Sequence, residues 1–511
     1  MKTNLPIHFY LLFLACLAFT APGFAQDGTL DPTFNGTGFQ LLSDSGSLHN
    51  RGSSVARQTD GKLIACGYAE FIGLNNYFTV VTRYNTNGTL DSSFGYNGIV
   101  HTRVDSVGSE GAVVRIQSDN KILIYANAFK INQDRNPLST VLIRYLPNGD
   151  LDSTFGTNGI TQRVDVAQYA SASQLLIQPD HKILVAASDY SDAFIARFTA
   201  SGQLDSSFSH TGVFQYNVSF NFTSVAGMLL DPNQKLIVVG TGSNGGNMFY
   251  YIRRFTADGI PDSTYSDDGI TNELSGDYRG TRISAIGYQS NGKIILAGDQ
   301  GYDPKNLLMI RYNADLTFDN SFDTAACKVR VNGELSRSKS AVVLADNRIA
   351  VVAVIGDDYD KLAVVRFNAN GGYDNSFGTG GYFKGPEVSV ATEILEQADG
   401  KVAFVCGEWD SINSRRIQSV YRLRNTTVMG LEEVDENTSA RLYPNPTTGR
   451  FRIASDKEVE SIRVFDLLGK EMAIQLLGNN EANASGYPAG IYQVEALMRD
   501  KSSIHLKMLL R

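Results

Sequence analysis

The stretch that decides the fold is Leu90-Asp91-Ser92-Ser93-Phe94-Gly95, because copies of it recur along most of the chain. The aspartates of successive copies stand 53 to 61 residues apart. A period of this length indicates a repeat architecture in which each copy is one small structural unit. The residue pairs of the copies, which we expect to build the scaffold, are Asp31 and Phe34, Asp91 and Phe94, Asp152 and Phe155, Asp205 and Phe208, Asp262 and Tyr265, Asp319 and Phe322, and Asp374 and Phe377.

Two further landmarks recur with the same period. One is Gln-x-Asp-Gly-Lys, as in Gln58 to Lys62, and the other is an Arg-aromatic step, as in Arg83-Tyr84. Asp-Gly and Asn-Gly tolerate the positive φ that hairpin turns demand, so we expect two-residue turns here. We also expect the Asp of each copy to accept hydrogen bonds from turn amides, and its Phe to fill the space between units.

The sequence of one repeat unit predicts four short strands. In the second copy they are residues 112–117, 121–126, 139–145 and 159–164. The second of these, KILIYA, is nearly all apolar, as a strand covered on both faces should be. A four-stranded antiparallel unit of about 57 residues is typical of a β-propeller blade.

The two ends of the repeat region are complementary. Asp27 to Asp31 matches the segment that elsewhere follows an Arg-aromatic step, whereas the last step, Arg422-Leu423, has no such segment after it. Pairing the first piece with the last unit would leave no open edge between them. We therefore predict an all-β protein with a seven-bladed β-propeller over residues 26–424, closed by its N-terminal strand.

The repeated motifs resemble the delta-60 repeat family of secreted bacterial proteins. Later copies depart from the pattern: Pro261 replaces Leu, Asp315 stands where Gly is expected, and Asp346-Asn347-Arg348 replaces Asp-Gly-Lys. The family is described by its repeat, so the resemblance implies no activity.

Composition excludes several classes of protein. The chain has 511 residues, a formal net charge of −8 and 42% hydrophobic residues, which is enough to bury a core. The acidic balance argues against nucleic-acid binding, which needs clustered Lys and Arg. Four cysteines are too few for a disulfide-stapled scaffold. Cys66 and Cys406 fall at similar places in the first and last copies, and we expect two buried thiols there rather than a disulfide.

Residues 1–25 are typical of a secretory signal peptide. Phe9 to Phe19 is an apolar run after Lys2, and Gly23-Phe24-Ala25 supplies small residues before Gln26. The run is too short to span a membrane as a helix. Cys16 allows a lipoprotein as an alternative, which the apolar residues beyond it disfavour.

The C-terminal part begins after a polar, acidic linker over residues 425–440. Short apolar runs at 451–454, 461–466, 491–497 and 504–510 predict a small β-sandwich over residues 441–511. An ordinary adhesive sandwich is one interpretation of this part.

This segment also resembles the type A C-terminal sorting domain of the type IX secretion system. The resemblance implies export by the type IX machinery, followed by release or attachment to surface lipopolysaccharide. The matching residues are Tyr443, Pro444, Asn445, Pro446, Gly449, Gly490, Tyr492 and Lys507.

Catalytic signatures are missing from the sequence. It contains neither a His-Glu-x-x-His zinc motif nor a Gly-x-Ser-x-Gly nucleophile elbow. His181 takes a slot that Gly or Asn fills in other copies, so we interpret it as a turn residue. We expect no catalytic residue, no metal site and no cofactor.

The candidate site lies in the loops that differ between copies, because a single site needs its special groups only once. Several of these loops combine carboxylates with aromatic rings, which suits a sugar, a cationic peptide or Ca²⁺. The alternative is an ordinary solvated rim. Two functions stay open: a binding or adhesion module for a glycan or protein ligand, and a secreted carbohydrate hydrolase or lyase. The candidate residues are Asp189, Tyr190 and Asp192; Asp299, Tyr302 and Asp303; Asp357, Asp358, Tyr359 and Asp360; and Glu408, Trp409 and Asp410.

Overall fold

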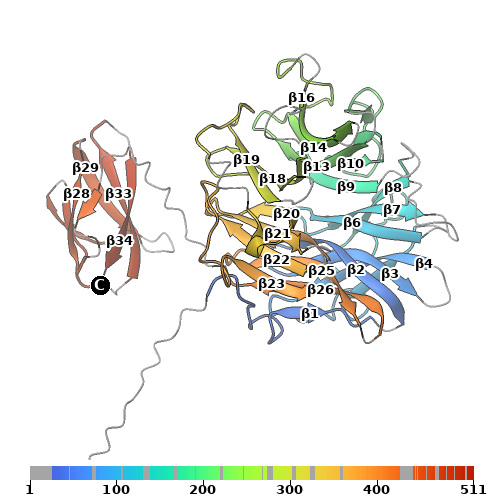
Figure 1. Ribbon diagram of the computed structural model, residues 1–511, viewed down its shortest axis with the longest axis horizontal. Helices are drawn as coiled ribbons and strands as arrows, with labels where there is room; N and C mark the ends of the chain where they lie inside the picture. Colours follow the sequence, from blue (N-terminus) through green and yellow to red (C-terminus); the bar gives the residue numbers. More distant parts are fainter. Residues whose placement is uncertain are drawn as a thin grey trace, which may run out of the picture.

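The computed structural model describes residues 26–425 and 441–510 with short gaps (Figure 1). The gaps are residues 45, 72–75, 105–107, 130–138, 165–170, 190, 219–221, 245–246, 267–268, 273–279, 302–305, 323–328, 357–360, 388–389, 412, 444, 446, 456, 466–470, 479, 488–489 and 501–502. The predicted signal peptide and nearly all of the predicted linker fall outside the described residues.

The regular secondary structure in the described part of residues 26–425 consists almost entirely of antiparallel sheets. The first has the order β2-β3-β4-β5, so each strand pairs with the next along the chain. Its strands are β2 (Ser47–Arg57), β3 (Leu63–Phe71), β4 (Asn76–Tyr84) and β5 (Ile99–Thr102). The sheets that follow it are β6 (Gly108–Ile116), β7 (Ile122–Phe129) and β8 (Ser139–Tyr145); β9 (Ser171–Ile177), β10 (Ile183–Ser188), β11 (Ala193–Phe198) and β12 (Val213–Tyr216); β13 (Phe222–Leu230), β14 (Leu236–Asn244), β15 (Asn247–Phe255) and β16 (Ile270–Asn272); β17 (Arg282–Tyr288), β18 (Ile294–Gln300) and β19 (Asn306–Tyr312); and β20 (Ser336–Val343), β21 (Ile349–Ile355), β22 (Lys361–Phe367) and β23 (Tyr382–Glu387).

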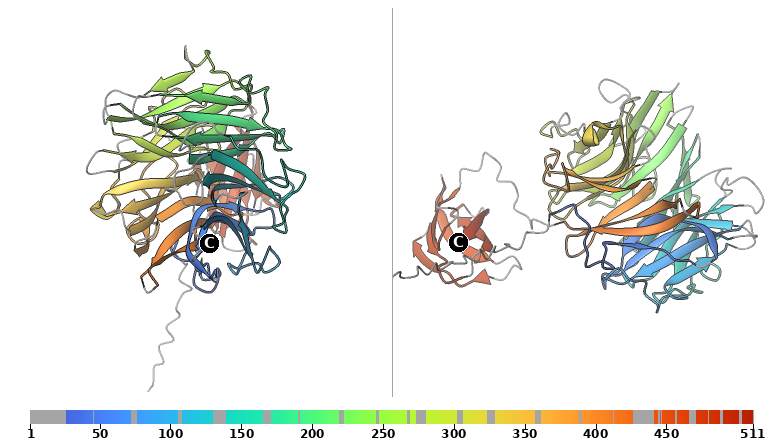
Figure 2. Two further views of the ribbon diagram at one scale, coloured as in Figure 1. Left: turned by 90° about the vertical axis from the view of Figure 1, so that its right-hand side faces the viewer. Right: turned by 60° about the horizontal axis from the view of Figure 1, so that its bottom comes forward.

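The last of these sheets combines the two ends of the repeat region. It contains β24 (Val390–Glu396), β25 (Val402–Asp410) and β26 (Arg415–Leu423), and its edge strand is β1 (Phe39–Leu41). β1 pairs antiparallel with β26, and Figures 1 and 2 show this N-terminal segment in blue beside the orange strands.

The first strand of each sheet contacts the first strand of the next, and we call these strands the inner strands. Figure 1 shows β2, β6, β9 and β13 stacked in this order, and contacts continue through β17, β20 and β24 back to β2. Each inner strand carries a β-bulge, where one residue is left unpaired and the strand bends.

Apolar side chains fill the space between neighbouring sheets. All eight residues of β7 are buried, as the KILIYA run predicts. Phe155 packs with side chains of β7, β10 and β11, and a methyl group at Gly202 would come within 2.8 Å of its ring. The motif aromatic of one sheet therefore packs on a glycine of the next.

Two local predictions were wrong. The turn after Gln117 has three residues, because Gln117 N donates to Lys121 O and positive φ occurs only at Asn120. This is the type I turn followed by a left-handed residue that often joins strands in three-residue loops. Residues 159–164 form isolated bridges to β8, at Ile160 and Val164, rather than a strand.

A third correction concerns the fifth copy. Leu316 has the positive φ of the expected glycine, at 68°. Asp315 instead accepts the Thr317 amide at 2.9 Å, as Asn87 does for Thr89.

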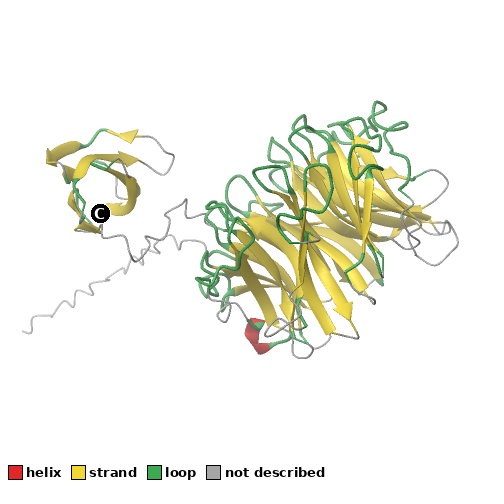
Figure 3. Ribbon diagram, turned by 90° about the horizontal axis from the view of Figure 1, so that it is seen from above, coloured by secondary structure: helices red, strands yellow, loops and turns green. Residues whose placement is uncertain are grey.

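The C-terminal part forms two four-stranded sheets around one apolar core, as predicted for a sandwich. One sheet has the order β27-β28-β32-β31 and the other β30-β29-β33-β34. Among the described residues, no helix is long and apolar enough to cross a membrane. Figure 3 shows strands throughout, and it also shows the short 3-10 helix η2 (Val331–Gly333). The strands are β27 (Arg441–Tyr443), β28 (Arg450–Ala454), β29 (Val459–Phe465), β30 (Glu471–Met472), β31 (Gln475–Gly478), β32 (Glu481–Asn483), β33 (Gly490–Met498) and β34 (Ser503–Leu510).

Candidate functional site

The three repeated landmarks meet at the motif aspartate. Asp152 is buried, and its Oδ2 accepts Arg144 Nε at 2.8 Å and lies 3.2 Å from Lys121 Nζ. Its Oδ1 accepts the backbone amide and the hydroxyl of Thr154 at 3.1 and 2.6 Å. The Arg-aromatic step, the Gln-x-Asp-Gly-Lys turn and the Leu-Asp-x-Ser-Phe motif thus supply one four-part cluster.

The arginine–aspartate pair of this cluster recurs in every copy. The Arg Nε to Asp Oδ2 distance lies between 2.6 and 2.8 Å throughout. The pairs are Arg422–Asp31, Arg83–Asp91, Arg144–Asp152, Arg197–Asp205, Arg254–Asp262, Arg311–Asp319 and Arg366–Asp374.

The arginines of most clusters also reach the neighbouring sheet. Arg144 Nη1 donates to Ala200 O at 2.7 Å, and the guanidinium lies 4.2 Å from the centre of the Phe155 ring. Arg197 makes the equivalent bond to Ala257 O at 2.6 Å. The arginine therefore ties its own sheet to the next one.

These carboxylates are held ionised. Burial raises the pKa of Asp152, but the hydrogen bonds of Thr154 and Lys121 and the charge of Arg144 outweigh it and lower that pKa to about 2. The pKa values of the other six motif aspartates are lowered by the same kinds of contact. A carboxylate of this kind cannot donate a proton near neutral pH, so it does not suit general-acid chemistry.

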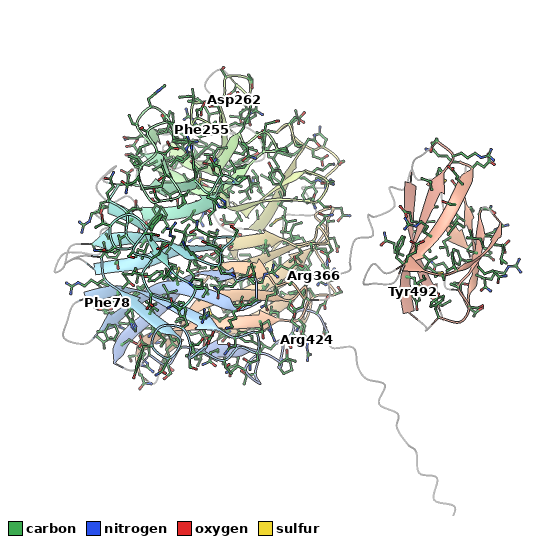
Figure 4. The ribbon with its side chains drawn as sticks, turned by 180° about the vertical axis from the view of Figure 1, so that it is seen from behind. Phe78, Phe255, Asp262, Arg366, Arg424 and Tyr492 are labelled. Atoms are coloured by element: carbon green, nitrogen blue, oxygen red, sulfur yellow. The ribbon has the colours of Figure 1, made fainter. Side chains whose placement is uncertain are left out.

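The two ends of the repeat region meet at Arg366. Its Nη1 contacts Asp27 Oδ2 at 2.7 Å and Asn425 Oδ1 at 2.6 Å, while its Nε pairs with Asp374. Arg424 O accepts the amide of Gly28 in the same region, and Figure 4 shows Arg366 and Arg424 on one side of the molecule. Residues from both ends thus occupy the position that a single continuous segment holds in other copies.

The predicted acidic loops are described only in part. Asp189 Oδ1 accepts the amides of Ser191 and Asp192 at 2.7 and 2.6 Å, so it closes its own turn. Asp299 lies in β18 rather than in a loop, is 1% exposed, and its Oδ2 is 3.6 Å from Arg282 Nη2. Tyr190, Tyr302, Asp303, Asp357, Asp358, Tyr359 and Asp360 lie outside the described residues.

The last acidic group also lies on a strand rather than in a loop. Glu408, Trp409 and Asp410 end β25. Glu408 Oε1 accepts the Tyr421 hydroxyl at 2.6 Å, and Asp410 Oδ2 accepts Asn413 Nδ2 at 2.7 Å. Trp409 is 40% exposed. Hydrogen bonds within the same hairpin thus engage both carboxylates.

The bulges of the inner strands reveal residues that sequence reasoning missed. The unpaired residue is small or β-branched in six sheets and a lysine in one. These residues are Ser53, Ala112, Ser173, Ala226, Ser284, Lys339 and Thr392. Aligning the copies by their bulges, rather than by their motifs, would have shown that Lys339 departs from the small or β-branched residues of the other copies.

Three arginines share the same offset from the bulge of their inner strand. Arg51, Arg282 and Arg337 each lie two residues before the bulge of their own inner strand. We call Arg51, Arg282, Arg337 and Lys339 the inner cationic cluster. Burial, followed by the charges of the three arginines, lowers the pKa of Lys339 to about 8, against the opposing influence of Asp299.

A cavity of about 400 Å³ lies where the first and last sheets meet, lined by Gly61, Gln397 and Lys401 among others. Between the first and second sheets, the side chain of Asn120 bridges the equivalent turns by accepting the Thr59 amide at 3.1 Å. Glycine at 61 has no side chain for this bridge, which leaves the cavity open.

The described residues contain no group of three or more His, Cys, Asp or Glu side chains that could hold a metal ion. Cys66 and Cys406 are buried free thiols, as predicted. His181 has a φ of 66°, as its interpretation as a turn residue requires.

The sorting-motif residues lie in the C-terminal sheets where the structure describes them. Tyr443 ends β27 and is exposed, whereas Gly449 is buried and precedes β28. Tyr492 is buried in β33, and Lys507 pairs with Gln493. Gly490 begins β33 and Asn445 is exposed, while Pro444 and Pro446 lie outside the described residues.

Repeated four-stranded sheets and a separate small sandwich define a β-propeller-type repeat protein with an appended C-terminal domain. Residues 58–94, 117–155, 178–208, 232–265 and 289–322 match the family described as Domain of unknown function (DUF5122) beta-propeller. Residues 441–510 match the Secretion system C-terminal sorting domain. The chain thus carries DUF5122 beta-propeller repeats and ends in a type IX sorting domain, which confirms the predicted resemblance and export to the cell surface or medium.

Solved structures are similar only at low identity. They include Drosophila Plexin A in complex with Semaphorin 1b (9% identity, covering 78% of this chain and 87% of that chain, TM-score 0.43). A puromycin hydrolase is 11% identical, with 90% of this chain and 58% of that chain covered and a TM-score of 0.41. An ulvan lyase is 9% identical, with 74% of this chain and 95% of that chain covered and a TM-score of 0.36. No curated protein matches the chain. Likeness at this level carries no argument about function.

Proposed function

We propose that residues 26–424 form seven blades closed into a ring by the N-terminal segment. Three observations support the proposal: β1 pairs with β26, the inner strands contact one another from β2 to β24 and back, and Arg366 binds Asp27 and Asn425 together. We further propose that residues 1–25 are a signal peptide and that residues 425–440 link the ring to the sorting domain.

We propose that the exported ring is a non-enzymatic binding or adhesion module. The observation that carries this proposal is that all seven motif carboxylates are paired with arginine and have lowered pKa values, so the repeat supplies anchors rather than reactive acids. The groups that differ between copies therefore carry the recognition. After export, the protein is released or stays attached to surface lipopolysaccharide.

The alternative function is a secreted carbohydrate hydrolase or lyase that uses acidic loop residues. Such an enzyme needs two carboxyl groups roughly 5–10 Å apart beside the substrate. Among the described acidic candidates, Glu408 and Asp410 share one hairpin, and both are engaged in local hydrogen bonds.

A combined binding and cleavage screen tests the proposal. The protein is mixed with a panel of bacterial and algal polysaccharides, and both its melting temperature and the release of new sugar ends are measured. We expect at least one ligand to raise the melting temperature with no new ends released. Release of sugar ends that disappears when Asp357, Asp358 and Asp360 are replaced by Asn would establish the enzyme instead.

A further inference from the structure

The cavity between the first and last sheets separates two equivalent turns. One is the turn after β2, where Gln58 N donates to Lys62 O at 2.9 Å, and the other is the turn after β24, where Gln397 N donates to Lys401 O at 2.7 Å. Residues of both turns line the cavity, which we call the seam cavity. Its volume of about 400 Å³ lies in the range of small-molecule sites, roughly 300–1,000 Å³.

At two other junctions between sheets, an asparagine side chain joins the equivalent turns. Asn120 Oδ1 accepts the amide of Thr59 at 3.1 Å, and Asn120 Nδ2 donates to the Thr59 hydroxyl at 2.8 Å. Asn347 makes the same two hydrogen bonds to Ser290, at 2.6 and 2.8 Å. A carboxamide group therefore fits the space between two such turns.

The seam lacks both halves of this bridge. Gly61 stands in the place of the asparagine, and Ala398 stands in the place of Thr59 and Ser290. The backbone amide of Ala398 has no hydrogen-bond partner among the described residues. The seam cavity therefore presents a free N–H group where a carbonyl oxygen is bound at the two bridged junctions.

The charged groups around the seam cavity answer one another. Lys401 Nζ lies 3.3 Å from Asp31 Oδ2 and 2.9 Å from Asp399 Oδ2. Arg422 Nε lies 2.8 Å from the same oxygen of Asp31. Two cations thus meet two carboxylates, and an ionised ligand would lose its hydration without gaining an unpaired opposite charge. The seam cavity therefore suits a neutral, polar ligand.

We propose that the seam cavity binds the acetamido group of an N-acetylated sugar. The carbonyl oxygen of that group accepts the amide of Ala398, as the asparagine oxygen accepts the equivalent amide at the bridged junctions. A carboxamide occupies only part of the cavity, which leaves room for a sugar ring beside the polar side chains of Thr33, Asn87 and Gln397. This site rests on the proposed binding function and adds the chemical group that the ligand carries.

Saturation-transfer NMR of the full chain tests the site. N-acetylglucosamine is the probe, and glucose, which lacks the acetamido group, is the control sugar. We expect saturable binding of N-acetylglucosamine, with the strongest transfer to its acetyl methyl protons, and at least about tenfold weaker binding of glucose. Equal binding of the two sugars, or no saturable binding of N-acetylglucosamine, would overturn the proposal.

Two variants place the binding in the seam cavity. Gly61→Asn restores the bridging carboxamide, and asparagine tolerates the left-handed φ of +85° at this position. Its Cβ would meet only Thr86 Cγ2, at 3.1 Å, which belongs to an exposed side chain. Ala398→Pro removes the N–H group and introduces the residue that Pro179 and Pro232 provide in other copies. Each variant should weaken the binding of N-acetylglucosamine at least about tenfold.

Gly292→Asn is the matched control. It makes the same substitution at the junction of the fourth and fifth sheets, where Pro232 offers no N–H group. This variant should bind N-acetylglucosamine as the wild type does. Unchanged affinity of Gly61→Asn and Ala398→Pro, with circular dichroism showing that they are folded, would overturn the proposal.

The two proposals fail separately. If N-acetylglucosamine does not bind but a polysaccharide raises the melting temperature without being cut, the module function stands and the seam site falls. If N-acetylglucosamine binds in the seam cavity while a polysaccharide is cut, the module function falls and the site stands.

Discussion

Replacing Asp152 by Asn measures how much one motif carboxylate contributes to the free energy of unfolding. Asparagine keeps an oxygen for the two Thr154 hydrogen bonds but turns an amide toward Arg144 Nε and Lys121 Nζ. The Arg144 side chain is 7% exposed, so it loses its anion without gaining water. Removing one partner of a buried ion pair costs about 3–5 kcal/mol. Because Arg144 keeps its hydrogen bond to Ala200 O, we expect the free energy of unfolding to fall by about 3 kcal/mol.

Asp119→Asn is the matched control for this substitution. Asp119 lies 3.5 Å from the same Lys121 but is 55% exposed, so its loss should cost less than about 1 kcal/mol. Urea unfolding followed by tryptophan fluorescence measures both values, because the chain has a single tryptophan, Trp409, and it lies in the last repeat sheet. Equal losses in the two variants would refute the assignment of Asp152 as an anchor.

Acid gives a second readout of the same contact. The pKa of Asp152 is lowered in the folded protein from its usual value of 3.8 to about 2. Its contribution to stability is therefore complete above about pH 4 and is lost as the pH falls through about 2. The stability difference between the wild type and Asp152→Asn should shrink over that interval, and a constant difference would contradict the ion pair.

Three further predictions follow from single positions. Gly202→Ala should lower the free energy of unfolding by roughly 2 kcal/mol or more, because the φ of Gly202 is +85° and the new methyl group would meet the Phe155 ring. Gly36 has open space around it, so Gly36→Ala should cost only the backbone strain of about 1 kcal/mol. Lys339→Ser should raise the free energy of unfolding in urea by about 1–2 kcal/mol at neutral pH, allowing for solvent screening. This gain should vanish as the pH rises from about 8 toward 10.5, because wild-type Lys339 loses its proton over that range. A gain that persists at high pH would contradict the charge explanation. Burial raises the pKa of the Cys66 thiol, so a thiol reagent should label it only in denaturant, and rapid labelling of the folded protein would contradict its burial.

The repeat could be predicted from sequence because its landmarks are local. Arg144 precedes Asp152 by eight residues, and the same spacing separates Arg83 from Asp91, whereas the spacing between the lysine and the aspartate varies with the loop between them. The apolar run of β7 and the complementary ends of the region also follow from short segments. The convergence of all three landmarks on one carboxylate needed coordinates, since it depends on how the strands pair.

The inner cationic cluster could not be predicted in this way. Lys339 and Arg337 belong to a strand with no motif, and their direction depends on a one-residue bulge that no local signal marks. Asp299 was assigned to a loop because β18 extends further than its apolar run suggests, and there it faces Arg282 instead.

Hydrogen exchange of the N-terminal segment tests the central claim most directly, because the proposed ring depends on that segment closing the last sheet. The amides of Gly28, Asp31 and Leu42 donate to Arg424 O, Arg422 O and Gln418 O at 2.8, 3.0 and 2.8 Å. We predict that these amides exchange as slowly as the amides of β25 and β26, since hydrogen-bonded strands of one cooperative unit open together. Exchange at the rate of an unstructured peptide, while β25 stays protected, would contradict it.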